Sequence, residues 1–221
     1  IALISACGGG GGGSSNAKPS TTPAPTATPL PIIVAGGGDL GNRASNSAAG
    51  SILVVGPGIY NDINLATGDL RGDITLIADP TGTQAGGFAG NVVINANNNA
   101  TAVEFTGQDS RIILDGFTIH GGVEATVRIV ESSNVTLRNC IIRESNGDGV
   151  YIQRSDSVLL FNNLIYFHRH AGVGIHGAAG TQVINNTIYG NNRGGVVAQG
   201  APVTGGVIAS RNLFLRNNII S

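Results

Sequence analysis

Apolar residues recur along the second half of the chain with a period of about 23 residues. The segments LDGFTI, LRNCII, LFNNLI and VINNTI begin at positions 114, 137, 160 and 183, and LRNNII begins at position 215, after a longer step. A second set of apolar triplets, VRI, VYI, VGI and VVA, begins at positions 127, 150, 173 and 196. Because two independent columns share one spacing, the sequence predicts a repeat architecture.

Each repeat contains three short segments in which apolar and polar residues alternate, which is the pattern of β-strands. Three strands and three turns make one coil of a parallel β-helix, and each coil stacks ~4.8 Å from the previous one. We therefore predict an all-β solenoid of about 23 residues per coil, with Ile119, Ile142, Ile165 and Ile188 stacked inside. The longer step before position 215 predicts a nine-residue insertion within 200–212.

Asparagines occupy one position in successive repeats. Asn139, Asn162, Asn185 and Asn217 form one column, and Asn163, Asn186 and Asn218 form the next. Stacked amides donate a hydrogen bond to one neighbour and accept one from the other. We interpret both columns as structural ladders at a tight turn, and we expect Cys140, which stands in the second column, to be a small buried side chain.

Residues 1–35 have a different character. Residues 1–6 are largely apolar, Cys7 follows, and a run of glycines and then prolines leads to residue 35. The stretch Ile4–Cys7 resembles the lipobox of bacterial lipoproteins. This resemblance implies the end of a signal peptide at 1–6 and a lipidated Cys7. Composition predicts a linker over 7–35, and the repeats predict a β-helix domain over 36–221. Because the last residues break off inside a repeat, we expect this domain to be truncated at its C-terminus. The lipobox resemblance also implies a membrane contact through the lipid anchor, in the bacterial cell envelope at the outer membrane or cell surface.

The segments ILVVGPGIYNDI, ITLIADP, DGFTIHG and the repeated NNTI-like turns are similar to the pectate-lyase-like superfamily of right-handed parallel β-helices. The resemblance covers residues ~36–221 at the level of the repeat. It implies a right-handed solenoid and a polysaccharide partner. It also implies a substrate groove along the outer face of the first strand of each coil.

We take as candidates the residues that lie on or beside this implied groove. The candidate catalytic residues are Tyr151, His168, Arg169, His170 and His176, and the candidate substrate-binding residues are Arg128, Glu144, Asp148 and Gln153. Tyr, His and Arg together supply the acid, the base and the carboxylate-neutralising cation that uronate elimination or epimerisation needs. Alternatively, the histidines decorate a solvated turn. A second row of outward residues includes Tyr166 and Tyr189. These tyrosines have two interpretations: aromatic stacking between coils, or a small platform for sugars.

Composition narrows the function further. The formal net charge is −1 and only 11% of residues are charged, so no basic footprint for nucleic acid is present. We expect no cofactor and no metal site, because the histidines lack acidic partners in adjacent repeats. Two functions stay open: a lyase or C5-epimerase of acidic glycans, and a non-catalytic glycan-binding, adhesive or spacer module. The oligomeric state is not predicted.

Overall fold

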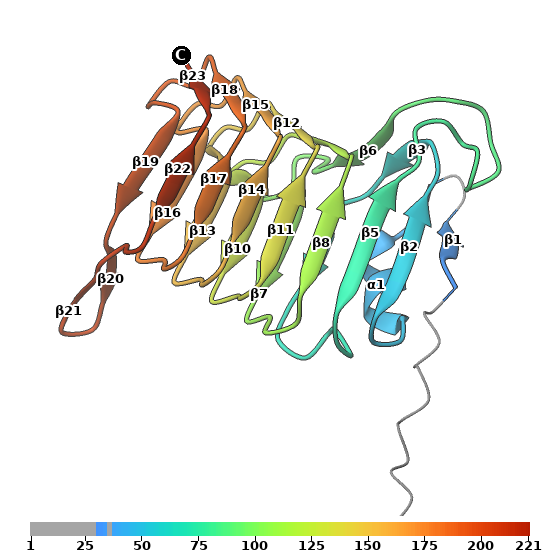
Figure 1. Ribbon diagram of the computed structural model, residues 1–221, viewed down its shortest axis with the longest axis horizontal. Helices are drawn as coiled ribbons and strands as arrows, with labels where there is room; N and C mark the ends of the chain where they lie inside the picture. The colour runs from blue at the N-terminus through green and yellow to red at the C-terminus, as the bar shows by residue number, and fades with distance from the viewer. Residues whose placement is uncertain (1–29, 35–36) are drawn as a thin grey trace, which may run out of the picture.

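A computed structural model describes residues 30–34 and 37–221, so the predicted signal end, Cys7 and most of the predicted linker lie outside the described residues. The chain winds through stacked coils, and successive coils add parallel strands to three sheets that enclose one core (Figure 1). This architecture confirms the predicted all-β parallel solenoid.

Each coil visits the three sheets in the same order. Sheet A has eight strands, β1 (Ile32–Val34), β2 (Ser51–Val55), β5 (Ile74–Ala78), β8 (Ile112–Asp115), β11 (Val135–Arg138), β14 (Leu159–Phe161), β17 (Gln182–Ile184) and β22 (Phe214–Arg216). Sheet B has seven, β3 (Gly58–Tyr60), β6 (Val92–Asn95), β9 (Thr118–His120), β12 (Ile141–Arg143), β15 (Leu164–Tyr166), β18 (Thr187–Tyr189) and β23 (Ile219–Ile220). Sheet C has six, β4 (Ile63–Leu65), β7 (Val103–Thr106), β10 (Ala125–Val130), β13 (Asp148–Gln153), β16 (Val173–His176) and β19 (Val196–Gln199).

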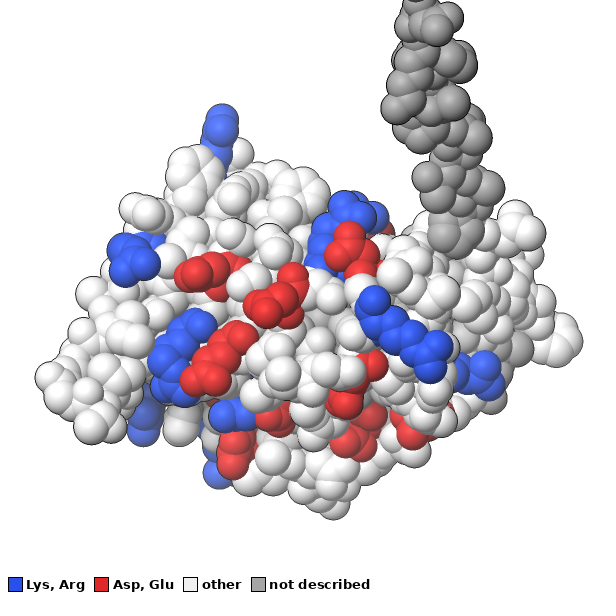
Figure 2. Space-filling model, turned by 90° about the horizontal axis from the view of Figure 1, so that it is seen from below, with Lys and Arg blue, Asp and Glu red and all other residues white. Residues whose placement is uncertain are grey.

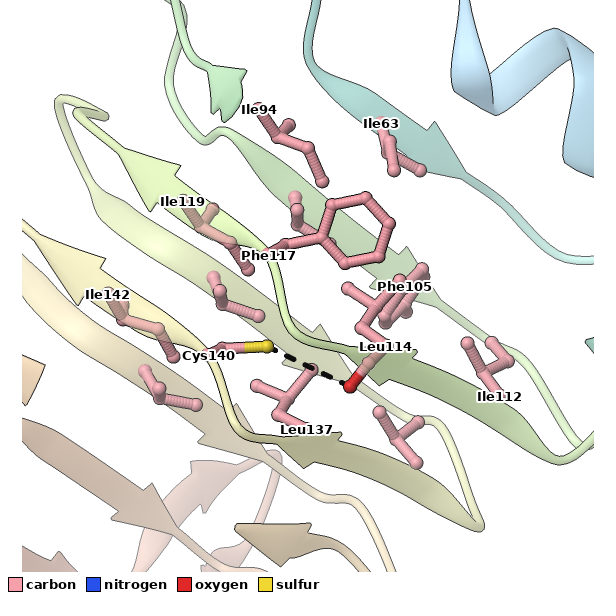
Figure 3. Close-up of a cluster of buried hydrophobic side chains, with 14 of the residues drawn as sticks. Ile63, Ile94, Phe105, Ile112, Leu114, Phe117, Ile119, Leu137, Cys140 and Ile142 are labelled. Carbon is pink, nitrogen blue, oxygen red and sulfur yellow. Dashed lines mark hydrogen bonds between the residues drawn. The ribbon is translucent and has the colours of Figure 1, made fainter. Parts of the chain in front are cut away.

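The predicted register is confirmed residue by residue. Ile119, Ile142, Ile165 and Ile188 are each 0% exposed and pair in sequence across sheet B. Figure 3 shows this interior, in which inward side chains from all three sheets meet. A single coil cannot bury its own apolar face, so the stacking of coils creates the core.

The asparagine columns lie at the turn between sheets A and B. Asn139, Asn162, Asn185 and Asn217 all have positive φ, between 53° and 57°, which asparagine tolerates better than most residues. In the adjacent column, Asn163 Nδ2 donates to Asn186 Oδ1 at 3.0 Å, and both side chains are buried. Cys140 continues that column, and burial raises the pKa of its thiol to about 12.

Three features depart from, or refine, the sequence prediction. Strand β1 pairs with β2 and Val34 is fully buried, so the folded domain begins within the segment that we assigned to the linker, not at residue 36. Helix α1 (Leu40–Asn46) precedes β2 and lies beside β4, in the place where a further strand of sheet C would stand. The predicted insertion is a projecting antiparallel hairpin of β20 (Ala201–Val203) and β21 (Gly206–Ile208) (Figure 1).

Candidate functional site

The outer face of sheet C presents one residue per coil in strict register. Glu104, Arg128, Tyr151, Gly174 and Val197 pair in that order across β7, β10, β13, β16 and β19. Side chains two residues apart on a strand share a face, so His176 lies on the same side as Gly174. The strands therefore bring residues from distant parts of the sequence onto one continuous surface.

Tyr151 and His176 contact one another across neighbouring coils. Their ring centroids are 4.6 Å apart, with planes inclined by 32°. Tyr151 stands directly opposite Gly174, and a Cβ at Gly174 would lie 2.5 Å from Asp148 Oδ2 and 3.0 Å from His176 Nε2. The absence of a side chain at residue 174 thus permits the aromatic contact.

The surroundings of His176 favour its neutral form. Burial lowers the pKa of His176 below its ordinary value, and the charge of Asp148, which acts in the opposite direction, offsets only part of this effect. The amide nitrogen of Gln199 lies 2.8 Å from Nδ1, and Nε2 lies 4.0 Å from Asp148 Oδ2. With the amide donating to Nδ1, the ring proton resides on Nε2, on the side of Asp148.

Two hollows adjoin Tyr151. The larger, of about 400 Å³, is lined by Asp148, Tyr151, His170, Ala171, Gly174, His176, Arg193, Val197 and Gln199. The smaller, of about 250 Å³, is lined by Glu124, Ala125, Arg128 and Tyr151. Since Tyr151 lines both, the two hollows are adjacent on sheet C, and we refer to them together as the depression.

Arg128 stands opposite Tyr151 on the neighbouring strand, but it is engaged in an ion pair. Its guanidinium pairs with the carboxylate of Glu104 on the preceding coil. Burial raises the pKa of Tyr151, and the Arg128 charge lowers it by a smaller amount, so the phenol is protonated near neutral pH.

His168 lies inside the coil and not on the surface. It is 1% exposed, its Nδ1 accepts from the backbone N–H of Ser145 at 3.1 Å, and its Nε2 lies 3.2 Å from the carbonyl oxygen of Ile142. Burial lowers the pKa of His168 to about 4. His168 is therefore a neutral, hydrogen-bonded histidine of the core. It is not a candidate catalytic residue, and it does not lie in a solvated turn.

Three other candidates lie apart from the depression. Glu144 faces the other side of its turn, where its carboxylate contacts His120 at 2.9 Å and Arg143 at 2.7 Å. Arg169 is exposed and Gln153 is half-buried, and neither is among the residues that line the two hollows. Of the candidate residues, the depression thus brings together Arg128, Asp148, Tyr151, His170 and His176.

Sequence reasoning missed Glu104, Glu124, Arg193 and Gln199. Glu104 lies one residue further from Arg128 than the repeat would place it, so it falls outside the regular columns. Gln199 and Arg193 follow His176 and His170 by one repeat, so their positions in the columns could have identified them as neighbours of the candidate histidines.

Neither a metal site nor a membrane span emerges from the described residues. In residues 30–34 and 37–221, no three His, Cys, Asp or Glu side chains are grouped in a way that could hold a metal ion. In the same part of the chain, no helix has the length and apolar character that a bilayer crossing requires.

The three parallel sheets built from successive coils make the structure a parallel β-solenoid, with two adjacent hollows on sheet C. Residues 125–221 match the family model for the right-handed β-helix region, and the match begins at the first residue of β10. Together, the match and the three sheets show that the fold is a right-handed parallel β-solenoid, as the sequence predicted. Searches of curated proteins and of solved structures found no match.

Proposed function

We propose that this chain binds a polysaccharide in the depression on sheet C. The observation that carries the proposal is the Tyr151–His176 ring contact over Gly174, beside the carboxylate of Asp148. Aromatic rings suit the C–H faces of sugars, while carboxylates and amides suit their hydroxyls. The right-handed β-helix fold suggests the pectate-lyase-like superfamily, and the sequence resemblance to that superfamily implies a substrate groove on this strand.

The charges in the depression favour a glycan that carries some carboxylates. Arg193 lines the larger hollow and forms no ion pair with the residues that the structure describes, whereas Arg128 is paired with Glu104. On the face shown in Figure 2, basic and acidic side chains lie next to one another and not in separate areas. Within the larger hollow, Arg193 is therefore the cation that a carboxylate of the glycan would meet.

Affinity electrophoresis of the folded domain in gels that contain pectate, alginate or chondroitin tests this proposal. Tyr151→Ala should abolish the retardation that wild type shows in at least one gel. Phe88→Ala provides the matched control, because Phe88 is 96% exposed on a loop outside the depression. Equal retardation of wild type and Tyr151→Ala in every gel would contradict the proposal, as would a lack of retardation of the wild type.

A second candidate function is uronate elimination or epimerisation, because an acid, a base and a cation line one hollow. Neutral His176 would take the C5 proton, and protonated Tyr151 would give a proton to O4 as the C4–O4 bond breaks and the C4–C5 double bond forms. Arg193 would neutralise the carboxylate. The base role requires the Gln199 amide to turn by half a rotation, so that its oxygen accepts from Nδ1–H and Nε2 is free.

Two measurements separate catalysis from binding alone. A lyase produces unsaturated uronate, which absorbs in the ultraviolet, and an epimerase changes the uronate composition that NMR reports. We expect the activity, if the chain is catalytic, to vanish in Tyr151→Phe while retardation in the gel persists. Binding without either product would leave the non-catalytic module as the function.

We further propose that Cys7 is lipidated and holds the domain at the bacterial envelope, on the resemblance of residues 4–7 to a lipobox. Cys7→Ser should move the protein from the membrane to the soluble fraction. Unchanged membrane fractionation of this variant would exclude the anchor.

A further inference from the structure

A second row of side chains follows the outer face of sheet B. Asn95, His120, Arg143, Tyr166 and Tyr189 pair in that order across β6, β9, β12, β15 and β18. The row therefore runs along the helix axis, one residue per coil. It contains two parts, an aromatic cluster and a polar hollow.

The aromatic cluster consists of Tyr166, Phe167 and Tyr189. The two tyrosine rings lie 5.2 Å apart with planes inclined by only 4°, as expected for stacking between coils. Phe167 stands nearly perpendicular to both, at 5.1 and 5.5 Å, and is 55% exposed, whereas both tyrosines are half-buried. Phe167 therefore presents the most accessible aromatic face of the cluster.

Backbone geometry fixes the Phe167 ring in this place. Phe167 has a φ of +60°, which is rare for a bulky residue. A Cβ at Gly190, one coil on, would lie 2.7 Å from two carbons of the ring. The same position of the adjacent coils, Glu144 and Gly190, also has positive φ, so this conformation belongs to the turn of the coil, and it places the ring over bare backbone.

The polar part is a hollow of about 360 Å³, lined among others by Asn95, Asn97, Asn98, His120 and Glu144. Glu144 accepts from Arg143 at 2.7 Å and contacts His120 at 2.9 Å. Burial raises the pKa of Glu144, but these two hydrogen bonds outweigh it and hold the pKa below the ordinary value. The carboxylate and the guanidinium therefore compensate one another, and the remaining lining is rich in neutral amides.

We propose that this row, which we call the sheet B strip, binds an uncharged polysaccharide whose chain runs along the helix axis. The coil spacing of ~4.8 Å is close to the length of one pyranose ring, so successive sugars would meet successive coils. Phe167 offers a face for sugar C–H groups, and the amides and Glu144 offer partners for hydroxyls. The pairing of Arg143 with Glu144 leaves this guanidinium occupied and less suited to a uronate.

The strip is separate from the depression on sheet C. Their hollows share no lining residue: in the turn at 121–124, Gly121, Gly122 and Val123 line the hollow of the strip, whereas Glu124 lines the smaller hollow of sheet C. The inference therefore does not rest on the function proposed for sheet C.

Tyrosine fluorescence offers a direct measurement, because the chain has no tryptophan and only four tyrosines. Titration of the folded domain with hydroxyethylcellulose, xyloglucan, galactomannan and dextran should change the emission for at least one glycan. Phe167→Ala should weaken that binding about tenfold, the usual order for one exposed aromatic contact. Tyr151→Ala and Phe88→Ala should leave it unchanged.

Several outcomes would overturn the proposal. It fails if no glycan of the panel binds, or if Phe167→Ala binds as tightly as wild type. It also fails if Phe167→Ala loses binding to pectate and not to an uncharged glycan. Gel filtration adds one more test, since a wild-type dimer that Phe167→Ala converts to a monomer would show that the cluster is a protein interface.

Discussion

At the scale of the residue, local packing decides which histidine is buried and which one lines a hollow. His168 and His170 are two positions apart, yet the first is 1% exposed and the second lines the larger hollow. Turns lack the regular alternation of strands, so spacing alone could not separate them. The column that holds His168 did carry a signal, because its neighbours Ser145 and Asn191 are polar residues suited to an internal hydrogen-bonded position.

His168 makes the stability of the domain dependent on pH. The unfolded histidine has a pKa of ~6.5, and the folded one about 4, so the unfolded state binds the extra proton between these values. Neutral His168 therefore contributes about 3 kcal/mol to the free energy of unfolding. This contribution is fully present above pH ~6.5 and is lost as the pH falls towards 4.

His168→Asn should remove this dependence, because asparagine does not titrate and stands at the same place one coil on, as Asn191. Urea unfolding at pH 7 and pH 4 gives the two free energies of unfolding for each protein. An unchanged pH slope in His168→Asn would contradict the assignment.

Gly174 is the residue on which the Tyr151–His176 contact depends. In Gly174→Ala the new methyl group would meet Asp148 and His176, and overpacking of this kind costs about 1–3 kcal/mol. We expect lower stability and weaker glycan binding together. Gly206→Ala is the control, since nothing lies within 4 Å of a Cβ at that position and its thermal unfolding should be unchanged.

At the scale of the element, each strand is fixed by its inward residues and by its position in the stack. The sequence predicted the strands from residue 112 onwards well, because the repeat is unbroken there as far as β19. It predicted the earlier coils less well, because a long loop after β5 and one extra residue between Glu104 and Arg128 interrupt the period. It did not predict α1, whose seven residues give too short a pattern to recognise.

Ile165→Asp tests the register of a single strand. Ile165 lies between Ile142 and Ile188 in the core, so the substitution buries an unpaired charge at a cost of several kcal/mol. Circular dichroism should show loss of the β signal at room temperature. The adjacent Leu164→Asp should remain folded, because Leu164 is only half-buried, and equal behaviour of the two variants would contradict the register.

At the scale of the whole molecule, the stacking of coils places residues that are one repeat apart in the sequence side by side on the surface. Every column along the axis repeats one position of the coil, so a depression on sheet C and a strip on sheet B arise from the same register. The columns could be predicted from the sequence. Which members pair off, as Arg128 does with Glu104, could not, because pairing depends on side-chain reach and burial.

The hydrogen bonds between coils run along the helix axis, and this orientation has a mechanical consequence. A force applied along the axis acts parallel to these hydrogen bonds. Each coil contacts only its neighbours. The coils should then detach one after another, each releasing about 80 Å of chain at ~3.4 Å per residue. Optical-tweezer traces should show this stepwise lengthening, whereas a single rupture of the whole domain would contradict it.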